Sequence, residues 1–532
     1  MTAVAMAAAV TTGAVVGSVG PAMAAQELPV LSPFRQAIAA AAGSDRALAA
    51  FYQARDYEPL WTGRGDARRR EAFFRALSGA GAQGLPVRRY DPAVLARAFR
   101  EVRTERDRDR LEVLMSEAFL QYAHDVQTGV LTPSKVDPDI KRKAPLRDRR
   151  ATIEAFAKSS PAAFLAQLPP HNPDYDRLLK AKLDMERLVA RGGWGPTVPD
   201  GKYEPGDSGR GVIALRNRLV AMGYLGRTAS ARYDGMLQHA VQLFQADHGL
   251  NADGVAGRDT VRALNVSARD RLKSIIVAME RLRWMNMDLG KRYVWVNEAD
   301  FTARVVDDGK TTFETRAVVG KNGKDTRSPE FSDQIEFMVV NPTWNVPRSI
   351  VTKEYLPMLQ KNPNAVSYLK LINSSGQTVS RDGIDFTQFT AQDFPFELKQ
   401  PPSARNALGL VKFMFPNRYN IYLHDTPTKY LFKRDTRAYS HGCIRLNDPF
   451  DFAYTLLRPQ TSDPKGVFKA ALATGVETIL NLKKPVPVHL VYFTAWPTAR
   501  GTMTYRRDIY GRDAEIFDAL AKAGVALDGV QG

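Results

Sequence analysis

The chain has 532 residues, more than one hydrophobic core normally accommodates, so we expect two to four domains. A hydrophobic content of 44% and a charged content of 25% exclude a largely disordered chain and a fibre. The net charge of +17 indicates a polyanionic partner, either nucleic acid or an anionic polymer outside the cell.

The N-terminal segment predicts export. Residues 1–25 carry no charge and end in Ala22-Met23-Ala24, a small-x-small pattern typical of signal-peptide cleavage. The basic segment that normally opens a signal peptide is missing, and a retained membrane anchor is the less favoured alternative. An exported protein does not meet nucleic acid, so carboxylate-rich polymers of the cell envelope are the expected partners.

Residues 26–195 are rich in Ala, Arg and Leu and show apolar residues at helical spacing. The pattern predicts a helical scaffold domain, in which we find no chemistry. Its clearest apolar face is formed by Leu111, Leu114, Met115, Phe119 and Tyr122.

A compact unit is predicted over 203–267, after a linker rich in Gly and Pro. Two Asp-Gly turns, Asp234-Gly235 and Asp253-Gly254, each precede a helix. The unit resembles the small three-helix peptidoglycan-binding domain over its whole length. It departs from that family at Arg216-Asn217-Arg218, where a Gln is common, so binding of glycan by this unit is left open.

From about residue 290 the periodicity changes to two, which predicts a β-rich domain over 290–500. An irregular stretch, about 350–408, is expected to be an insertion or lid between strands, and 501–532 to be a C-terminal tail. Strands are predicted at 293–296, 301–306, 311–319, 335–340, 419–423 and 488–493.

The single cysteine of the chain, Cys443, is the strongest indication of chemistry. Cysteines of exported proteins are normally paired, so a lone thiol favours a nucleophile over the alternative of a buried structural cysteine. A thiol needs a lowered pKa or an adjacent base to act as a nucleophile. His424 ends a predicted strand and has a fixed position, whereas His441 shares a tight turn with Cys443, so His424 is the preferred base.

The neighbours of these two residues suggest supporting roles. Gly442 allows the chain to bend closely, so amide groups of residues 441–443 are expected to face a developing oxyanion, with the hydroxyl of Ser440 as a further donor. The carbonyl or the carboxylate of Asp425 is expected to orient the base. Zinc binding is disfavoured because one cysteine with His424 and His441 lacks the spacing of a zinc site.

His424 and the segment Ser440-His441-Gly442-Cys443 resemble the YkuD-type catalytic domain of L,D-transpeptidases. The resemblance implies Cys443 as nucleophile, His424 as base, and an oxyanion loop at Ser440, His441 and Gly442. It extends to the blocks Val319-Gly320-Lys321, Ser328-Pro329, Asn341-Pro342-Thr343-Trp344 and Gly409-Leu410-Val411-Lys412-Phe413.

We expect Arg445 and Trp344 to bind substrate. Arg445 stands where many family members have Asn, and it either pairs with a substrate carboxylate or braces the loop. The sequence alone does not decide between these two roles.

The whole layout resembles the large multi-domain periplasmic branch of this family. It implies a monomeric enzyme without metal or organic cofactor that joins stem peptides of peptidoglycan by 3-3 cross-links. The same site serves an L,D-carboxypeptidase if water is the acceptor, or a lipoprotein-anchoring enzyme if a lysine is. A non-enzymatic peptidoglycan-binding protein is the remaining alternative.

Overall fold

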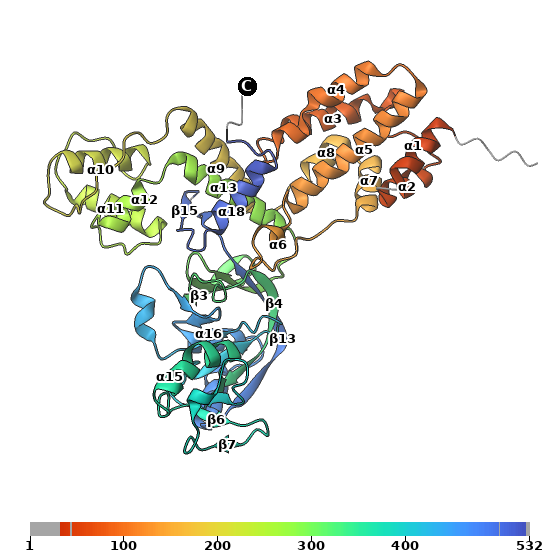
Figure 1. Cartoon of the computed structure of the whole chain (residues 1–532). Coiled ribbons are helices and arrows are strands. Elements are labelled where there is room, and N and C mark those ends of the chain that lie inside the picture. The colour runs from red at the N-terminus through yellow and green to blue at the C-terminus, as the bar shows by residue number, and fades with distance from the viewer. Residues whose placement is uncertain (1–31, 43–44, 499–500, 528–532) are drawn as a thin grey trace, which may run out of the picture.

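The computed structural model describes residues 32–42, 45–498 and 501–527. The predicted signal peptide, residues 1–25, lies outside the described residues. Within them the chain is a multi-domain α+β protein, with helices above a β-rich domain (Figure 1). No helix in these ranges is both long enough and apolar enough to cross a membrane.

The N-terminal helices pack around one aromatic core, in which Trp61, Phe73, Phe119 and Phe156 are fully buried. Helix α5 begins with a capping box between Thr104 and Asp107, as its sequence favours. The helices are α1 (Pro33–Ala42), α2 (Arg46–Gln53), α3 (Ala67–Ser78), α4 (Pro92–Glu101), α5 (Glu105–Thr128), α6 (Pro133–Val136), α7 (Arg149–Lys158), α8 (Pro161–Ala166) and α9 (Pro173–Ala190).

The unit predicted as three-helical contains α10 (Arg210–Ala221), α11 (Gly235–Asp247) and α12 (Arg258–Leu264). The carboxylate of Asp234 caps α11 by accepting from the amide of Leu237 at 2.9 Å. Arg216 is buried and donates to Asp234 at 2.9 Å and to the carbonyl of Arg232 at 2.7 Å. The departure from the family pattern at Arg216 therefore ties α10 to the first Asp-Gly turn.

Helix α13 (Ala268–Trp284) is buried along most of its length and joins the parts of the molecule. It packs against α9 of the N-terminal region and against α18 (Arg512–Lys522), as Figure 1 shows. Residues 501–532, predicted as a C-terminal tail, instead contain α18 and the hairpin strand β15 (Met503–Tyr505). The tail prediction is corrected because Ile516 and Leu520 are fully buried against α13.

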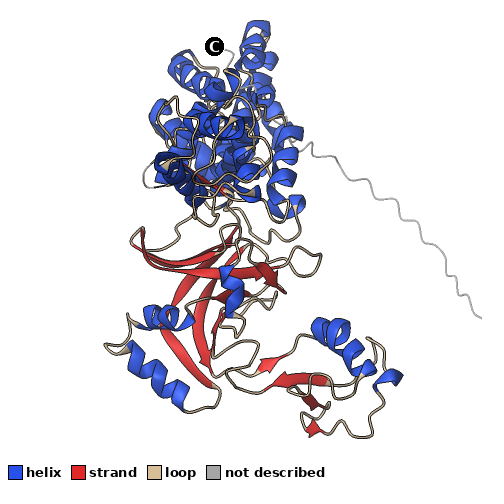
Figure 2. Ribbon diagram, turned by 90° about the vertical axis from the view of Figure 1, so that its left-hand side faces the viewer, coloured by secondary structure: helices blue, strands red, loops and turns tan. Residues whose placement is uncertain are grey.

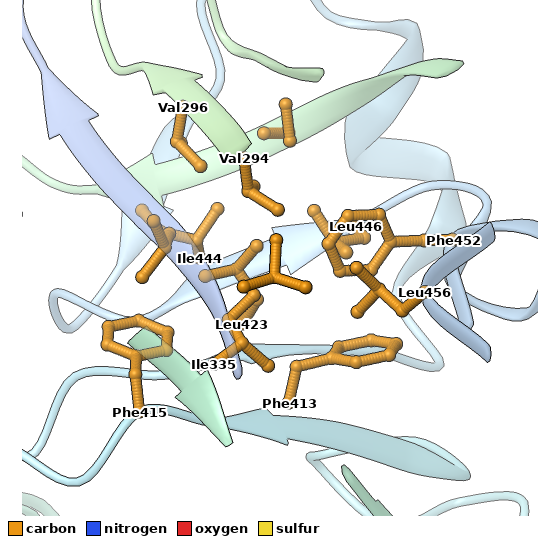
Figure 3. Packing of buried hydrophobic residues seen from close by; sticks show 14 of the residues in the cluster. Val294, Val296, Ile335, Phe413, Phe415, Leu423, Ile444, Leu446, Phe452 and Leu456 are labelled. Atoms are coloured by element: carbon orange, nitrogen blue, oxygen red, sulfur yellow. The ribbon is translucent and has the colours of Figure 1, made fainter. Parts of the chain in front are cut away.

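The β-rich domain is built on nine strands in the order β11-β3-β12-β10-β9-β4-β13-β1-β2. Strand β2 also pairs with β3, so the sheet closes on itself around an apolar interior (Figure 3). Its strands are β1 (Arg292–Asn297), β2 (Thr302–Asp307), β3 (Lys310–Gly320), β4 (Phe331–Val340), β9 (Val411–Met414), β10 (Leu423–His424), β11 (Ala438–Ser440), β12 (Ile444–Leu446) and β13 (Thr478–Val491). Helices α16 (Pro449–Leu457) and α17 (Pro464–Ala473) cover it, and β14 (Ala495–Pro497) pairs with β15.

The predicted insertion forms a lobe with its own hydrophobic core, set to one side of the closed sheet (Figure 2). Its first strand lies before residue 350, the predicted start. Asn406 fastens the neck of the lobe by donating to the carbonyls of Pro342 at 3.1 Å and of Gln400 at 3.0 Å. The lobe contains β5 (Trp344–Asn345), α14 (Arg348–Ile350), a π-helical turn (Val351–Tyr355), α15 (Leu356–Lys361), β6 (Lys370–Ile372), β7 (Thr378–Val379) and β8 (Glu397–Gln400).

Candidate active site

Two parallel strands bring the predicted nucleophile and base together. In the pairing of β10 with β12, Leu423 lies opposite Ile444 and His424 lies opposite Arg445. Cys443 directly precedes β12, and the amide of Ile444 donates to the carbonyl of Tyr422 at 3.1 Å. Residues two apart on a strand share a face, so Tyr422 lies on the face of His424 and Cys443 on that of Arg445.

The thiol of Cys443 is half-buried and protonated at neutral pH. Its Sγ donates to the carbonyl of Asn420 at 3.5 Å. Burial raises the pKa of Cys443 to about 11, while hydrogen bonds from the backbone and hydroxyl of Tyr422 and the charge of Arg445 act in the opposite direction. A nucleophile with this pKa needs a base when it attacks.

His424 is buried and neutral at pH 7. Burial, followed by the positive charge of Arg445, lowers the pKa of His424 to about 3. Nδ1 of the ring lies 2.5 Å from the carbonyl oxygen of Asp425. Since a carbonyl only accepts, Nδ1 carries the proton in this contact, and a hydrogen bond to the carbonyl of Leu408 also acts to raise the pKa of the ring.

Of the two ways in which Asp425 was expected to orient the base, the structure shows the carbonyl. The carboxylate of Asp425 points elsewhere, accepting from the amide of Leu410 at 2.9 Å and lying 2.8 Å from Nζ of Lys429. In the described part of the chain no hydrogen bond joins Sγ to the imidazole of His424. Tyr422 connects them, because its hydroxyl bonds to Sγ and its ring meets that of His424 edge to face.

The turn before Cys443 is held by Ser440. The hydroxyl of Ser440 donates to the carbonyl of Cys443 at 2.6 Å and accepts from the amide of Gly442 at 3.1 Å. The amide of Gly442 is thus engaged within the turn, which leaves those of His441 and Cys443 as candidates for an oxyanion. Gly442 has φ +115°, a conformation that requires glycine.

The side chain of His441 contacts Glu354 of the inserted lobe and Lys321, which directly follows β3. Its Nε2 lies 2.6 Å from a carboxylate oxygen of Glu354 and 3.2 Å from Nζ of Lys321. This contact fits the choice of His424 over His441 as the base.

A cavity of about 490 Å³ lies between the closed sheet and the inserted lobe. Both predicted substrate-binding residues, Trp344 and Arg445, line it. Arg445 donates to the hydroxyl of Thr428 at 3.2 Å, whereas its Nε is buried with no hydrogen-bond partner among the described residues. Trp344 and Arg405 reach the cavity from the lobe, and none of the described residues that line it is acidic. The cavity therefore favours an anionic ligand.

Sequence reasoning missed Tyr422 and Arg405. Tyr422 precedes His424 by two residues on a predicted strand, and this spacing was a usable signal for a shared face. Arg405 has no local signal, since only the fold of the lobe brings it to the cavity.

The domain that contains the closed sheet, the buried His424 and the turn of Cys443 matches a known family model. Residues 291–486 match the family model of the L,D-transpeptidase catalytic domain of YkuD type. Residues 208–264 match the model described as "Putative peptidoglycan binding domain", and residues 46–181 the model described as "Scaffold domain". Residues 291–486 are thus similar to an L,D-transpeptidase catalytic domain, and residues 208–264 to a peptidoglycan-binding domain.

A relative from Haemophilus influenzae, described as "Putative L,D-transpeptidase", is 32% identical over 227 residues. The match covers 42% of this chain and 45% of the relative, so it spans about half the length of the relative. L,D-transpeptidase structures from Xylanimonas cellulosilytica and Stackebrandtia nassauensis are each 16% identical and cover 56% of this chain. They match over 98% and 96% of their own chains with TM-scores of 0.17 and 0.20, values too low to bear on the fold.

Proposed function

We propose that the chain is a peptidoglycan L,D-transpeptidase that forms 3-3 cross-links through a thioester on Cys443. The observation that carries the proposal is the pairing of β10 with β12, which brings a neutral, buried His424 on β10 close to Cys443, the residue directly before β12. The chain acts outside the cytoplasmic membrane, in the periplasm, as a monomer.

In the first half-reaction Sγ of Cys443 attacks the carbonyl of the L-centre of the diamino acid at position three of a tetrapeptide stem. His424 takes the thiol proton and returns it to the departing amine as the bond to the terminal D-Ala breaks. The amides of His441 and Cys443 face the oxyanion, and Asp425 holds the imidazole through its carbonyl. The product is a thioester and free D-Ala.

In the second half-reaction the amine of a neighbouring stem attacks the thioester. His424 accepts a proton from the amine, a new amide bond forms, and the sulfur leaves and is reprotonated. Arg445 and Trp344 line the cavity beside the lobe and hold the donor there, with the guanidinium of Arg445 pairing with a carboxylate. The peptidoglycan-binding domain places the site near the polymer.

The test is mass spectrometry of products from a disaccharide-tetrapeptide, with wild type and Cys443→Ala side by side. The proposal expects a dimer that has lost one D-Ala, made only by wild type. Formation of tripeptide without dimer would show that the enzyme acts as a carboxypeptidase and does not form cross-links. A dimer formed equally by Cys443→Ala would contradict the thioester.

A further inference from the structure

The catalytic turn is supported by residues that lie beyond the matched catalytic domain. The family match ends at residue 486, yet Tyr510 and Arg512 are fully buried against the loop that carries Ser328. Ser328 in turn contacts Gly442 of the catalytic turn. The three side chains form one connected set of hydrogen bonds.

Ser328 fixes the carbonyl of Gly442. Its buried hydroxyl donates to that carbonyl at 2.7 Å and accepts from the amide of Gly320 at 2.9 Å. The amide of Gly442 donates a hydrogen bond to the hydroxyl of Ser440. Both polar groups of a glycine, the residue with the greatest backbone freedom, are therefore restrained.

The carbonyl of Gly442 and the N–H of Cys443 belong to one peptide group. This group is planar and trans, so its C=O and N–H point in opposite directions. When Ser328 holds the oxygen, it also sets the direction of the Cys443 N–H, which points away from Ser328. That N–H is one of the two amides left to stabilise an oxyanion.

Tyr510 holds Ser328 in place. Its hydroxyl donates to the carbonyl of Gly320 at 2.6 Å and accepts from the amide of Ser328 at 3.4 Å. Gly320 is tightly packed here, because a Cβ would lie 2.0 Å from the carbonyl oxygen of Thr326. The loop from 320 to 328 thus closes tightly around the hydroxyl of Tyr510.

Arg512 connects this support to the rest of the molecule. Its guanidinium donates to the carbonyl of Ser328 at 2.7 Å and to Glu298 at 3.0 Å. It also donates to Asp137 at 3.1 Å, a residue of the N-terminal helical region. One buried side chain therefore joins the scaffold, the catalytic domain and the C-terminal segment.

We propose that Ser328, Tyr510 and Arg512 are positioning residues, which aim the N–H of Cys443 at the oxyanion of the acyl-transfer reaction. The C-terminal segment, which carries Tyr510 and Arg512, then contributes to catalysis by holding the turn before Cys443. This inference rests on the proposed function, because it assigns the role of the turn in acyl transfer.

The test separates positioning from simple structural support by using two reactions of the same thiol. Alkylation of Cys443 by iodoacetamide forms no oxyanion, whereas release of D-Ala from a tetrapeptide donor does. We expect Ser328→Ala and Tyr510→Phe to lower kcat for D-Ala release by about tenfold to a hundredfold. KM and the alkylation rate should stay within about twofold of wild type, since binding and the thiol are untouched.

Tyr505→Phe is the matched control, because the hydroxyl of Tyr505 is buried with no hydrogen-bond partner in the described residues. It should leave kcat unchanged. The inference is overturned if Ser328→Ala and Tyr510→Phe keep the wild-type kcat, or if kcat and alkylation fall together. Absence of D-Ala release by wild type would instead overturn the proposed function.

Discussion

The rings of Tyr422 and His424 meet edge to face, with centroids 5.7 Å apart. The hydroxyl of Tyr422 also hydrogen-bonds to Sγ of Cys443 and lowers the pKa of the thiol. One side chain therefore contacts both the nucleophile and the base, and its hydroxyl favours the thiolate over the thiol.

Tyr422→Phe should slow the alkylation of Cys443 at pH 8 by about tenfold, since a hydrogen bond to a charged group contributes about 1.4 kcal/mol. The measurement is the rate of iodoacetamide labelling by mass spectrometry. Tyr439→Phe is the control, because Tyr439 is exposed on strand β11, which does not pair with β10 or β12. Equal labelling rates for wild type and Tyr422→Phe would show that the hydroxyl of Tyr422 has no effect on the thiol of Cys443.

The pH dependence of labelling follows from the two pKa values. With the pKa of Cys443 raised to about 11 and that of His424 lowered to about 3, the resting pair is a neutral thiol and a neutral imidazole. The labelling rate of the free enzyme should keep rising with pH beyond 9. A plateau reached below pH 8 would instead reveal a preformed thiolate–imidazolium pair.

Arg445→Met should weaken the preference for donors that end in a free carboxylate. Arg445 lines a cavity whose described lining contains no acid, so its guanidinium favours a carboxylate there. The measurement compares kcat/KM for a tetrapeptide with that for its C-terminal carboxamide. We expect wild type to prefer the acid by about tenfold or more and Arg445→Met to lose most of that preference. If wild type uses both donors equally, Arg445 braces the loop only.

The partly buried His248 should make the protein less stable in mild acid. Burial, followed by the charge of Arg271, lowers the pKa of His248 in the folded protein. The stability from the neutral ring is complete above the unfolded value of about 6.5 and is lost as the pH falls below it. The free energy of unfolding in urea should fall less between pH 7 and 5 in His248→Gln than in wild type. The exposed His239→Gln should retain the wild-type difference, and an unchanged difference in His248→Gln would contradict this reasoning.

Glu112 stabilises the N-terminal helical core. Its buried carboxylate accepts from the amides of Leu60 at 2.6 Å and Thr62 at 2.9 Å, and from the hydroxyl of Tyr52 at 2.6 Å. Glu112→Ala leaves these donors unpaired and should cost about 3 kcal/mol in the free energy of unfolding. Glu105→Ala, on the exposed first turn of the same helix, should cost less than about 1 kcal/mol. Equal losses would show that the buried contacts contribute little.

The sequence predicted the class of fold and the contact between the segments of His424 and Cys443, because strand periodicity and a rare residue type are local signals. It predicted a strand over 419–423, whereas β10 is Leu423–His424. The side chain of Asn417 bonds to the carbonyl of Ile421 at 2.8 Å, and Asn420 has φ +55°, so the chain bends where a strand was expected.

Long-range contacts could not be predicted from local patterns. Nothing near Ser328 indicates that Tyr510 and Arg512 lie against it, since these residues meet only in the folded chain. Strands of two to four residues in the lobe are likewise too short to show a period of two. For α18 a signal was present, because Ile516, Phe517 and Leu520 follow helical spacing.

The most direct test of the account is the intact mass of the enzyme, quenched in acid during turnover of a tetrapeptide donor. We expect a population of wild type that is heavier by the donor without its terminal D-Ala, with the adduct located on Cys443 by peptide mapping. Cys443→Ala should show no adduct. Release of D-Ala at the wild-type rate by Cys443→Ala, or an adduct on another residue, would contradict it.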